Sequence, residues 1–179
     1  MVSILDGLKL EKEWDYILTQ QGSHQSGFIE TYEPYLGKIL NFVKNNSKFK
    51  HFGWQETWAY GKNMDWPNNQ FAKYNRDPEI MYKKIHECVT QISENYKDLF
   101  IINSGDVVKN AFEELKINLY DNHDFHMNEI GCYLIGTNFI KLLLGEKVKN
   151  VYVPSNDVIS KDICKRIFEF INKQEGFKK

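Results

Sequence analysis

The chain has 179 residues, of which 42% are hydrophobic and 26% are charged, a balance typical of one folded domain rather than a disordered segment. The formal net charge is −1 and no basic block occurs, so neither nucleic acid nor an anionic membrane surface is indicated as a partner. Three cysteines far apart in sequence form no disulfide framework, and the first residues show no secretory leader. We therefore expect a cytoplasmic setting for the chain as given, with the location of any longer parent protein left open.

The first third of the chain predicts a helix, a strand and a second helix. A charged helix opens the sequence and ends near Glu13, and residues 14–20 (WDYILTQ) have the β-branched and aromatic character of a buried strand. The polar stretch 20–26 (QQGSHQS) then interrupts the apolar pattern, as a functional loop at the end of a strand would. Apolar residues recur at helical spacing from Thr31 onward, until the NNS at 45–47 stops the helix.

Two further strands are expected, separated by a long loop and a helix. Residues 51–60 (HFGWQETWAY) predict the second strand, and the polar, aromatic loop 61–77 follows it. Pro78 suits the first turn of a helix with a regular apolar face. Residues 99–103 (LFIIN) predict the third strand, which is short and buried.

Three helices are expected in the remainder of the chain. Ser104 is a plausible cap for the first, whose apolar face would include Phe112, and Asn128 for the second. The last helix is expected to open at Ser155 or Asn156. The three cysteines all fall on expected apolar helix faces, where a reduced thiol packs as a small hydrophobe. They are Cys88, Cys132 and Cys164.

The alternation of strands and helices predicts an α/β fold in one domain that spans residues 1–179. Connections of this kind are right-handed crossovers, which produce a parallel sheet covered by helices on both faces. Because ligands of such sheets bind beyond the carboxyl ends of the strands, three loops are expected to form a site. These are residues 20–26, 58–63 and 103–106.

Two aspartates and two histidines lie within six positions, at Asp121, His123, Asp124 and His126. A histidine beside a carboxylate that orients its ring is the base of many hydrolases. The same residues also suit a solvated polar turn ahead of the Asn128 helix, and spacing alone does not decide between the two interpretations. A metal site is less favoured, because the chain has no His-Glu-x-x-His helix and the other histidines are isolated in sequence.

Two further stretches carry candidate binding groups. Residues 20–24, at the end of the first strand, offer amide and backbone donors for an oxyanion, although a turn stabilised by its own side chains explains them equally well. Trp58 and Tyr60 offer aromatic faces for a sugar-like ligand, although aromatic residues at strand ends are more often part of the core.

Several blocks of the sequence resemble the SGNH/GDSL hydrolase superfamily, in the order expected of a bacterial branch of unknown function. They are WDYILTQQGSHQSGFIETYEPYLGKIL, QETWAYGKN, RDPEIMYKKI, INSGDVVKNAF and LYDNHDFHMNEIGCYLIGTNFIKLLLGE. The resemblance implies a three-layer α/β/α fold of flavodoxin-like type and hydrolysis of esters, often acyl groups on carbohydrates. It places the catalytic histidine on His126, and it leaves the orienting carboxylate between Asp124, the nearer choice, and Asp121, because His123 stands where the family has aspartate.

The resemblance also assigns a substrate and oxyanion environment. This comprises Gln20, Gln21, Gly22, Ser23 and His24, with Trp58 and Tyr60 at the neighbouring strand end. The family block with a Gly-x-Ser turn and the nucleophilic serine has no counterpart here, so the first βα unit is expected to be missing and the fragment to be inactive alone.

Two functions are therefore predicted. The first is an SGNH-type serine esterase for acylated carbohydrate or a small-molecule ester, and the alternative is a non-catalytic carbohydrate-binding or interaction module with the same fold. No cofactor and no metal are predicted. A homodimer is expected to form through the sheet edge that the missing strand would leave uncovered.

Overall fold

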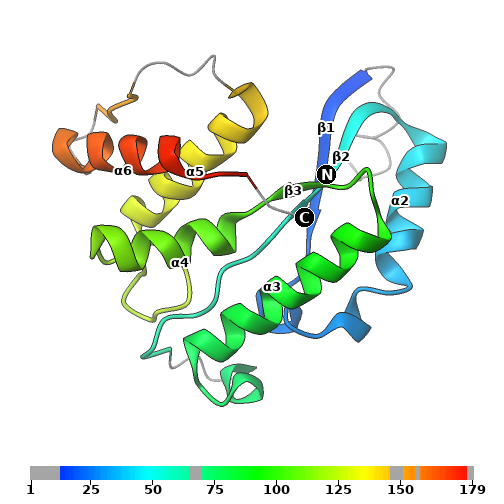
Figure 1. The fold of residues 1–179 in the computed structure, drawn as a ribbon, viewed down its shortest axis with the longest axis horizontal. Coiled ribbons are helices and arrows are strands. Elements are labelled where there is room, and N and C mark those ends of the chain that lie inside the picture. Colours follow the sequence, from blue (N-terminus) through cyan, green and yellow to red (C-terminus); the bar gives the residue numbers. More distant parts are fainter. Residues whose placement is uncertain (1–12, 65–69, 146–150, 156–157, 177–179) are drawn as a thin grey trace, which may run out of the picture.

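The computed structural model describes residues 13–64, 70–145, 151–155 and 158–176, and it forms an α/β fold in three layers. Three parallel strands lie at its centre in the order β1-β2-β3. Figure 1 shows α2 and α3 on one side of this sheet, and α4, α5 and α6 on the other. The strands are β1 (Glu13–Gln20), β2 (Lys48–Gln55) and β3 (Phe100–Ile102). The α-helices are α2 (Tyr35–Asn46), α3 (Pro78–Asn95), α4 (Ser104–Leu115), α5 (Glu129–Leu144) and α6 (Lys161–Lys173). This confirms the predicted fold class.

The strands pair in parallel, so their carboxyl ends lie at one edge of the sheet. In the ladder between β1 and β2, Glu13 stands opposite Lys48 and Gln20 opposite Gln55. The shorter ladder between β2 and β3 ends with Gln55 opposite Ile102. The expected second strand is therefore shorter than predicted at its carboxyl end, because β3 ends there and leaves residues beyond Gln55 without a ladder partner. Three short 3₁₀ helices complete the connections: η1 (Ser23–Gln25), η2 (Ile29–Thr31) and η3 (Gln70–Tyr74).

Two apolar clusters hold the helices in place. The first joins α2 and α3 to the sheet through buried side chains such as Leu36, Trp54 and Ile85. The second joins α4, α5 and α6 through residues such as Val107, Leu134 and Phe170. Helix α5 also contacts β3, which brings this group of helices against the other face of the sheet. Within the described part of the chain, no helix is both long and apolar enough to cross a membrane.

Side-chain caps fix the starts of three helices. The Asp77 carboxylate accepts the backbone N–H of Glu79 at the start of α3, and Asn128 Oδ1 accepts the N–H of Gly131 in α5. The last helix begins later than predicted, at Lys161, because Ser160 Oγ accepts the N–H of Ile163. The prediction of Ser155 as its start is therefore wrong, and Asn156 lies outside the described residues, as does the helix expected before Glu13.

Two expectations about the apolar faces are wrong. Phe112 is 57% exposed on α4 rather than buried, because this position faces away from the cluster formed with α5 and α6. Cys132 is exposed on α5, whereas Cys88 and Cys164 are buried as expected. A helix apolar nearly all round does not reveal from sequence which of its faces will pack, so Cys132 was placed on the wrong side.

Candidate functional site

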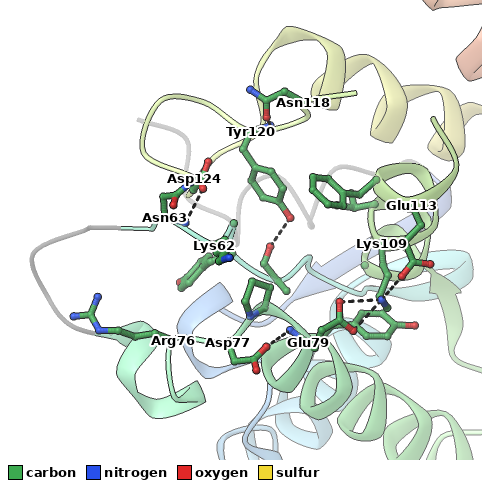
Figure 2. Close-up of a pocket in the computed structure, with 18 of the residues that line it drawn as sticks. Lys62, Asn63, Arg76, Asp77, Glu79, Lys109, Glu113, Asn118, Tyr120 and Asp124 are labelled. Atoms are coloured by element: carbon green, nitrogen blue, oxygen red, sulfur yellow. Dashed lines mark hydrogen bonds and ion pairs between the residues drawn. The ribbon is translucent and has the colours of Figure 1, made fainter. Parts of the chain in front are cut away.

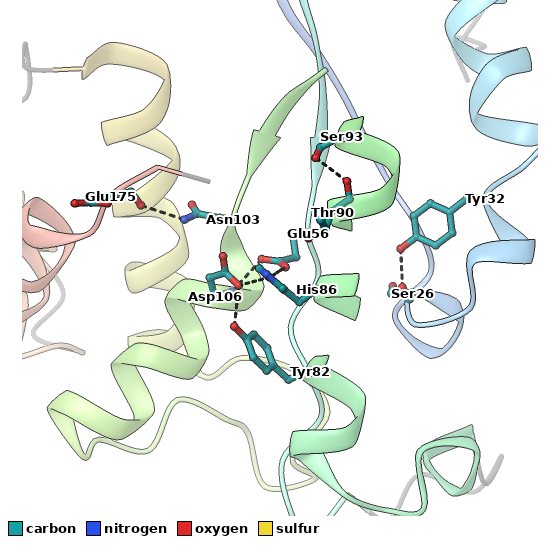
Figure 3. Close-up of polar contacts among 10 residues, drawn as sticks. All are labelled: Ser26, Tyr32, Glu56, Tyr82, His86, Thr90, Ser93, Asn103, Asp106 and Glu175. Atoms are coloured by element: carbon teal, nitrogen blue, oxygen red, sulfur yellow. Dashed lines mark hydrogen bonds and ion pairs between the residues drawn. The ribbon is translucent and has the colours of Figure 1, made fainter. Parts of the chain in front are cut away.

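Three ionisable side chains converge just beyond the carboxyl ends of β2 and β3. Glu56 follows β2 directly, Asp106 lies in the first turn of α4, and His86 comes from the middle of α3. His86 Nδ1 is 2.9 Å from Asp106 Oδ1 and 3.5 Å from Glu56 Oε1. Figure 3 shows Tyr82, one turn before His86, with its hydroxyl directed at Asp106. That hydroxyl donates a hydrogen bond of 3.0 Å to Asp106 Oδ1. We call Glu56, His86 and Asp106 the polar triad.

The start of α4 approaches Glu56 so closely that only glycine fits at position 105. The backbone N–H of Asp106 donates to Glu56 Oε2 at 3.0 Å, which uses one of the N–H groups that have no partner within a helix. A Cβ on Gly105 would lie 2.5 Å from the Thr57 carbonyl oxygen and 2.9 Å from Glu56 Cδ. The position of the Glu56 carboxylate therefore depends on the absence of a side chain at Gly105.

Burial and charge shift the pKa values of the triad. The Glu56 side chain is fully buried, and this burial raises the pKa of its carboxyl group. The neighbouring Glu56 carboxylate, together with Asp106, raises the pKa of His86 to about 9. His86 therefore carries a positive charge at neutral pH, which compensates negative charge that burial would otherwise disfavour.

A cleft of about 910 Å³ opens beside the triad, between α3, α4 and the loops that precede α3 and α5. Tyr82 and Gly105, which both contact the triad, also line this cleft. Its volume falls in the range of sites that hold a small molecule. Aromatic and amide groups are prominent in its lining, among them Tyr60, Asn63, Phe112, Asn118 and Tyr120, and the Asp124 carboxylate also lines it.

Three charged side chains of the cleft wall are paired with one another. Lys109 Nζ lies 2.9 Å from Glu79 Oε2 and 2.7 Å from Glu113 Oε1, joining α3 to α4. On the opposite wall, Asp124 Oδ2 accepts the N–H of Asn63 at 2.8 Å, and the Tyr120 hydroxyl donates to the Ala59 carbonyl at 2.9 Å (Figure 2). These contacts preform the cleft.

The predicted catalytic loop is built around its two aspartates. Asp121 Oδ1 accepts the N–H groups of His123 and Phe125, and Asp124 bonds to Asn63 across the cleft. Asp124 has a positive φ of 53°, a backbone conformation that aspartate tolerates better than most residues. Both carboxylates thus bind backbone N–H groups of the protein.

The two histidines of this loop are exposed. The His126 ring packs edge-on against the Phe125 ring, with centroids 4.4 Å apart. Within the described residues, neither Asp121 nor Asp124 hydrogen bonds to the His126 ring. The structure therefore brings Asp124 to the cleft and leaves His126 accessible, without the carboxylate partner that the resemblance implies.

The loop after β1 is held by its own side chains. The Gln21 amide donates to the Thr31 carbonyl at 2.9 Å and its oxygen accepts the N–H of Gly22 at 2.8 Å. The His24 carbonyl accepts the Tyr74 hydroxyl, and Ser23 starts the short helix η1. Exposed Gln20 lines, with Gln21, a second cleft of about 480 Å³ between this loop and α2.

The two aromatic residues proposed beside this loop lie in different surroundings. Tyr60 is almost fully buried, lines the large cleft, and packs edge-on against Phe71. Trp58 is half-buried and packs against the cluster formed by α4, α5 and α6.

Sequence reasoning missed the polar triad: His86 was counted among the histidines that are isolated in sequence, whereas in the structure it lies beside Asp106 and Glu56. Glu56 was included in the expected second strand, and the acidic partners of His86 lie 30 positions before it and 20 positions after it, beyond the reach of local spacing. The available signal was indirect: Glu56 and Asp106 each follow a predicted strand, and the carboxyl ends of neighbouring parallel strands meet.

Comparison with known proteins places this architecture in a family. The sequence profile of the family described as a domain of unknown function (DUF4886) matches residues 2–166. The chain belongs to the DUF4886 family. The crystal structure of a DUF4886 family protein from Bacteroides uniformis ATCC 8492 has the same fold, with a TM-score of 0.83 and 25% sequence identity. The match covers 94% of this chain and 64% of that DUF4886 protein, so this chain spans less than two thirds of its length. No curated protein matches.

Proposed function

We propose that this DUF4886 domain is an acyl-ester hydrolase of SGNH/GDSL type that acts on acylated carbohydrates. The observation that carries the proposal is the preformed cleft of about 910 Å³ at the carboxyl edge of the parallel sheet. Its lining combines aromatic rings with amides, which suits the apolar faces and the hydroxyl groups of a sugar. The loop that contributes Asp124 to this cleft also carries His126 two residues later.

In this proposal, His126 acts as the general base. Its exposed ring is accessible to a substrate, and Asp121 and Asp124 hold the surrounding loop through their bonds to backbone N–H groups. The proposal places the nucleophile outside the described residues, because two of the serines near the sheet edge are bonded or buried and the resemblance assigns no catalytic role to Ser23. Ser26 Oγ donates to the Gly22 carbonyl and accepts the Thr57 hydroxyl, and Ser104 is fully buried.

The test compares two histidine variants of the same loop in the longest form of the protein that the coding sequence provides. Initial rates are measured with p-nitrophenyl acetate and with an acetylated sugar. We expect His126→Ala to lower kcat/KM by about a hundredfold or more, the usual contribution of a general base. The matched control, His123→Ala, should stay within about threefold of the parent protein. Equal effects of both variants, or full activity of His126→Ala, would show that the base is wrongly assigned.

The contacts of the two aspartates favour one alternative, a carbohydrate-binding module without catalysis. Both carboxylates bind backbone N–H groups, which leaves the His126 ring without an orienting partner among the described residues. Under this alternative, the longest form of the protein shows no esterase activity but retains sugars on a glycan array. Phe112→Ala should weaken that binding, because this exposed ring lines the cleft, whereas Tyr152→Ala, an exposed aromatic residue elsewhere, should not.

A further inference from the structure

We propose that Glu56, His86 and Asp106 bind a divalent transition-metal ion, with Zn²⁺ as the reference case. One ligand atom from each of the three side chains lies within 4.8 Å of the others. The three residues come from different elements that meet beyond the carboxyl ends of β2 and β3 (Figure 3). This site is separate from the histidine loop on which the proposed hydrolase function depends.

The spacing of the side chains fits the coordination shell of zinc. Zinc bonds to histidine nitrogen and carboxylate oxygen are about 2.0–2.2 Å long, so two ligands of a tetrahedral ion are about 3.3 Å apart. His86 Nδ1 is 2.9 Å from Asp106 Oδ1 and 3.5 Å from Glu56 Oε1, on either side of that value. Two of the three ligand pairs therefore already have separations close to the tetrahedral value, and the Glu56–Asp106 pair lies within 4.8 Å.

Glu56 supplies the independent observation that points to a ligand. Its side chain is fully buried, yet Oε1 accepts no hydrogen bond in the described part of the chain. The other oxygen, Oε2, is bound by the backbone N–H of Asp106. Buried polar atoms almost always have a hydrogen-bond partner, but the contact printed for Oε1 is the ion pair with His86 Nδ1 at 3.5 Å. A metal ion held between these two atoms would take the place of the proton that His86 carries in the metal-free protein and would satisfy Oε1 directly.

Groups around the triad orient the proposed ligands. The Tyr82 hydroxyl donates to Asp106 Oδ1, and the N–H of Asp106 fixes Glu56 through Oε2. Hydrogen bonds of this kind hold the ligands of metal sites in position and commonly change affinity by 10- to 100-fold. Because Gly105 leaves room for Glu56, the backbone itself is shaped around this carboxylate.

The ligand types favour a transition metal over magnesium or calcium. Imidazole suits zinc and its neighbours in the transition series, whereas magnesium and calcium prefer oxygen ligands alone. Two carboxylates also neutralise the charge of a divalent ion. Three protein ligands leave a coordination position for water, as in catalytic zinc sites, and the His86 side chain is 41% exposed, which gives an ion access.

The experiment is a titration of EDTA-stripped protein with ZnCl₂ by isothermal calorimetry. We expect one ion per chain. Glu56→Gln should lower the affinity for Zn²⁺ at least tenfold, because the amide keeps the shape of the side chain but removes the negative charge of the ligand oxygen. The control is Glu79→Gln, which removes a carboxylate of α3 that binds Lys109 instead of the triad, and it should leave the affinity within twofold.

A second variant and a spectroscopic measurement distinguish loss of the metal site from misfolding of Glu56→Gln. Half-exposed His86 is changed to Gln, circular dichroism verifies the fold of each variant, and Co²⁺ replaces Zn²⁺ as a coloured probe. Tetrahedral Co²⁺ bands that are present in the parent and lost in His86→Gln would support the site. The proposal is overturned if the folded parent binds no stoichiometric Zn²⁺, if both ligand variants bind as tightly as the parent, or if His123→Ala or His126→Ala abolishes binding instead.

Discussion

Replacing Gly105 by alanine measures how much stability depends on the close approach of α4 to Glu56. In an exposed helix interior, Gly→Ala stabilises a protein by up to about 1 kcal/mol, because alanine loses less backbone entropy on folding. At position 105 the new Cβ would lie 2.5 Å from the Thr57 carbonyl oxygen, which is backbone and cannot rotate away. The two groups would have to separate by roughly half an ångström, and overpacking of this kind costs about 1–3 kcal/mol.

The matched control is Gly136→Ala in α5, where a Cβ would meet nothing within 4 Å. We expect this variant to gain about 0.5–1 kcal/mol. Gly105→Ala should instead lose about 1–3 kcal/mol, which for a chain of this size lowers Tm by about 2–12 °C. Urea unfolding followed by circular dichroism gives both values. Equal stabilisation by the two alanines would refute the reasoning, since it would mean that α4 does not approach Thr57 and Glu56 as closely as the structure shows.

Three further predictions concern the triad, a helix cap and the sheet edge. In EDTA, the stabilisation from His86 should be complete below pH 6.5 and lost as pH rises through about 9, since its folded-state pKa is raised. After allowance for solvent screening, the loss of free energy of unfolding between these pH values should be about 1–2 kcal/mol, measured by urea unfolding. If a His86→Gln variant shows the same pH dependence, His86 is not the group responsible. Asn128→Ala should lower the free energy of unfolding by about 1 kcal/mol, measured by thermal unfolding, because it removes the side-chain cap on the N–H of Gly131. Unchanged stability would mean that packing alone fixes the start of α5. Strand β1 lies at the end of the strand order, so light scattering should detect a dimer, and a sharply melting monomer would reject pairing through that edge.

Local patterns in the sequence predicted most of the elements correctly. Helix α3 begins at Pro78 with Asp77 as its cap, and α5 is capped by Asn128, because these signals involve residues only a few positions apart. The predicted carboxyl end of β2 and the predicted start of α6 were wrong. The end of β2 depends on a strand that is distant in sequence, whereas the start of α6 depends on a competing cap residue nearby. Strand β2 stops where its partner β3 stops, and Ser160 caps α6 in preference to Ser155.

The candidate site also combines features that neighbouring residues reveal with contacts that only the fold creates. Residues 121–126 were recognisable as a polar cluster because their side chains are close in sequence. Their contacts were not, since Asp124 bonds to Asn63, which is 61 positions away. Phe112 was expected in the core from its helical spacing, although it lies on the cleft side of α4.

The sequence by itself determined that this chain forms a parallel α/β sheet with its loops gathered at one edge. Periodicity and capping are written into neighbouring residues, and the handedness of the crossovers then leaves few arrangements. Only the tertiary structure decided that His86 meets Asp106, 20 positions later, and that the backbone of Asp106 meets Glu56, 50 positions earlier. The rotation of α3 about its axis and the closeness of α4 at Gly105 set these contacts, and both depend on how the whole core packs rather than on any local pattern.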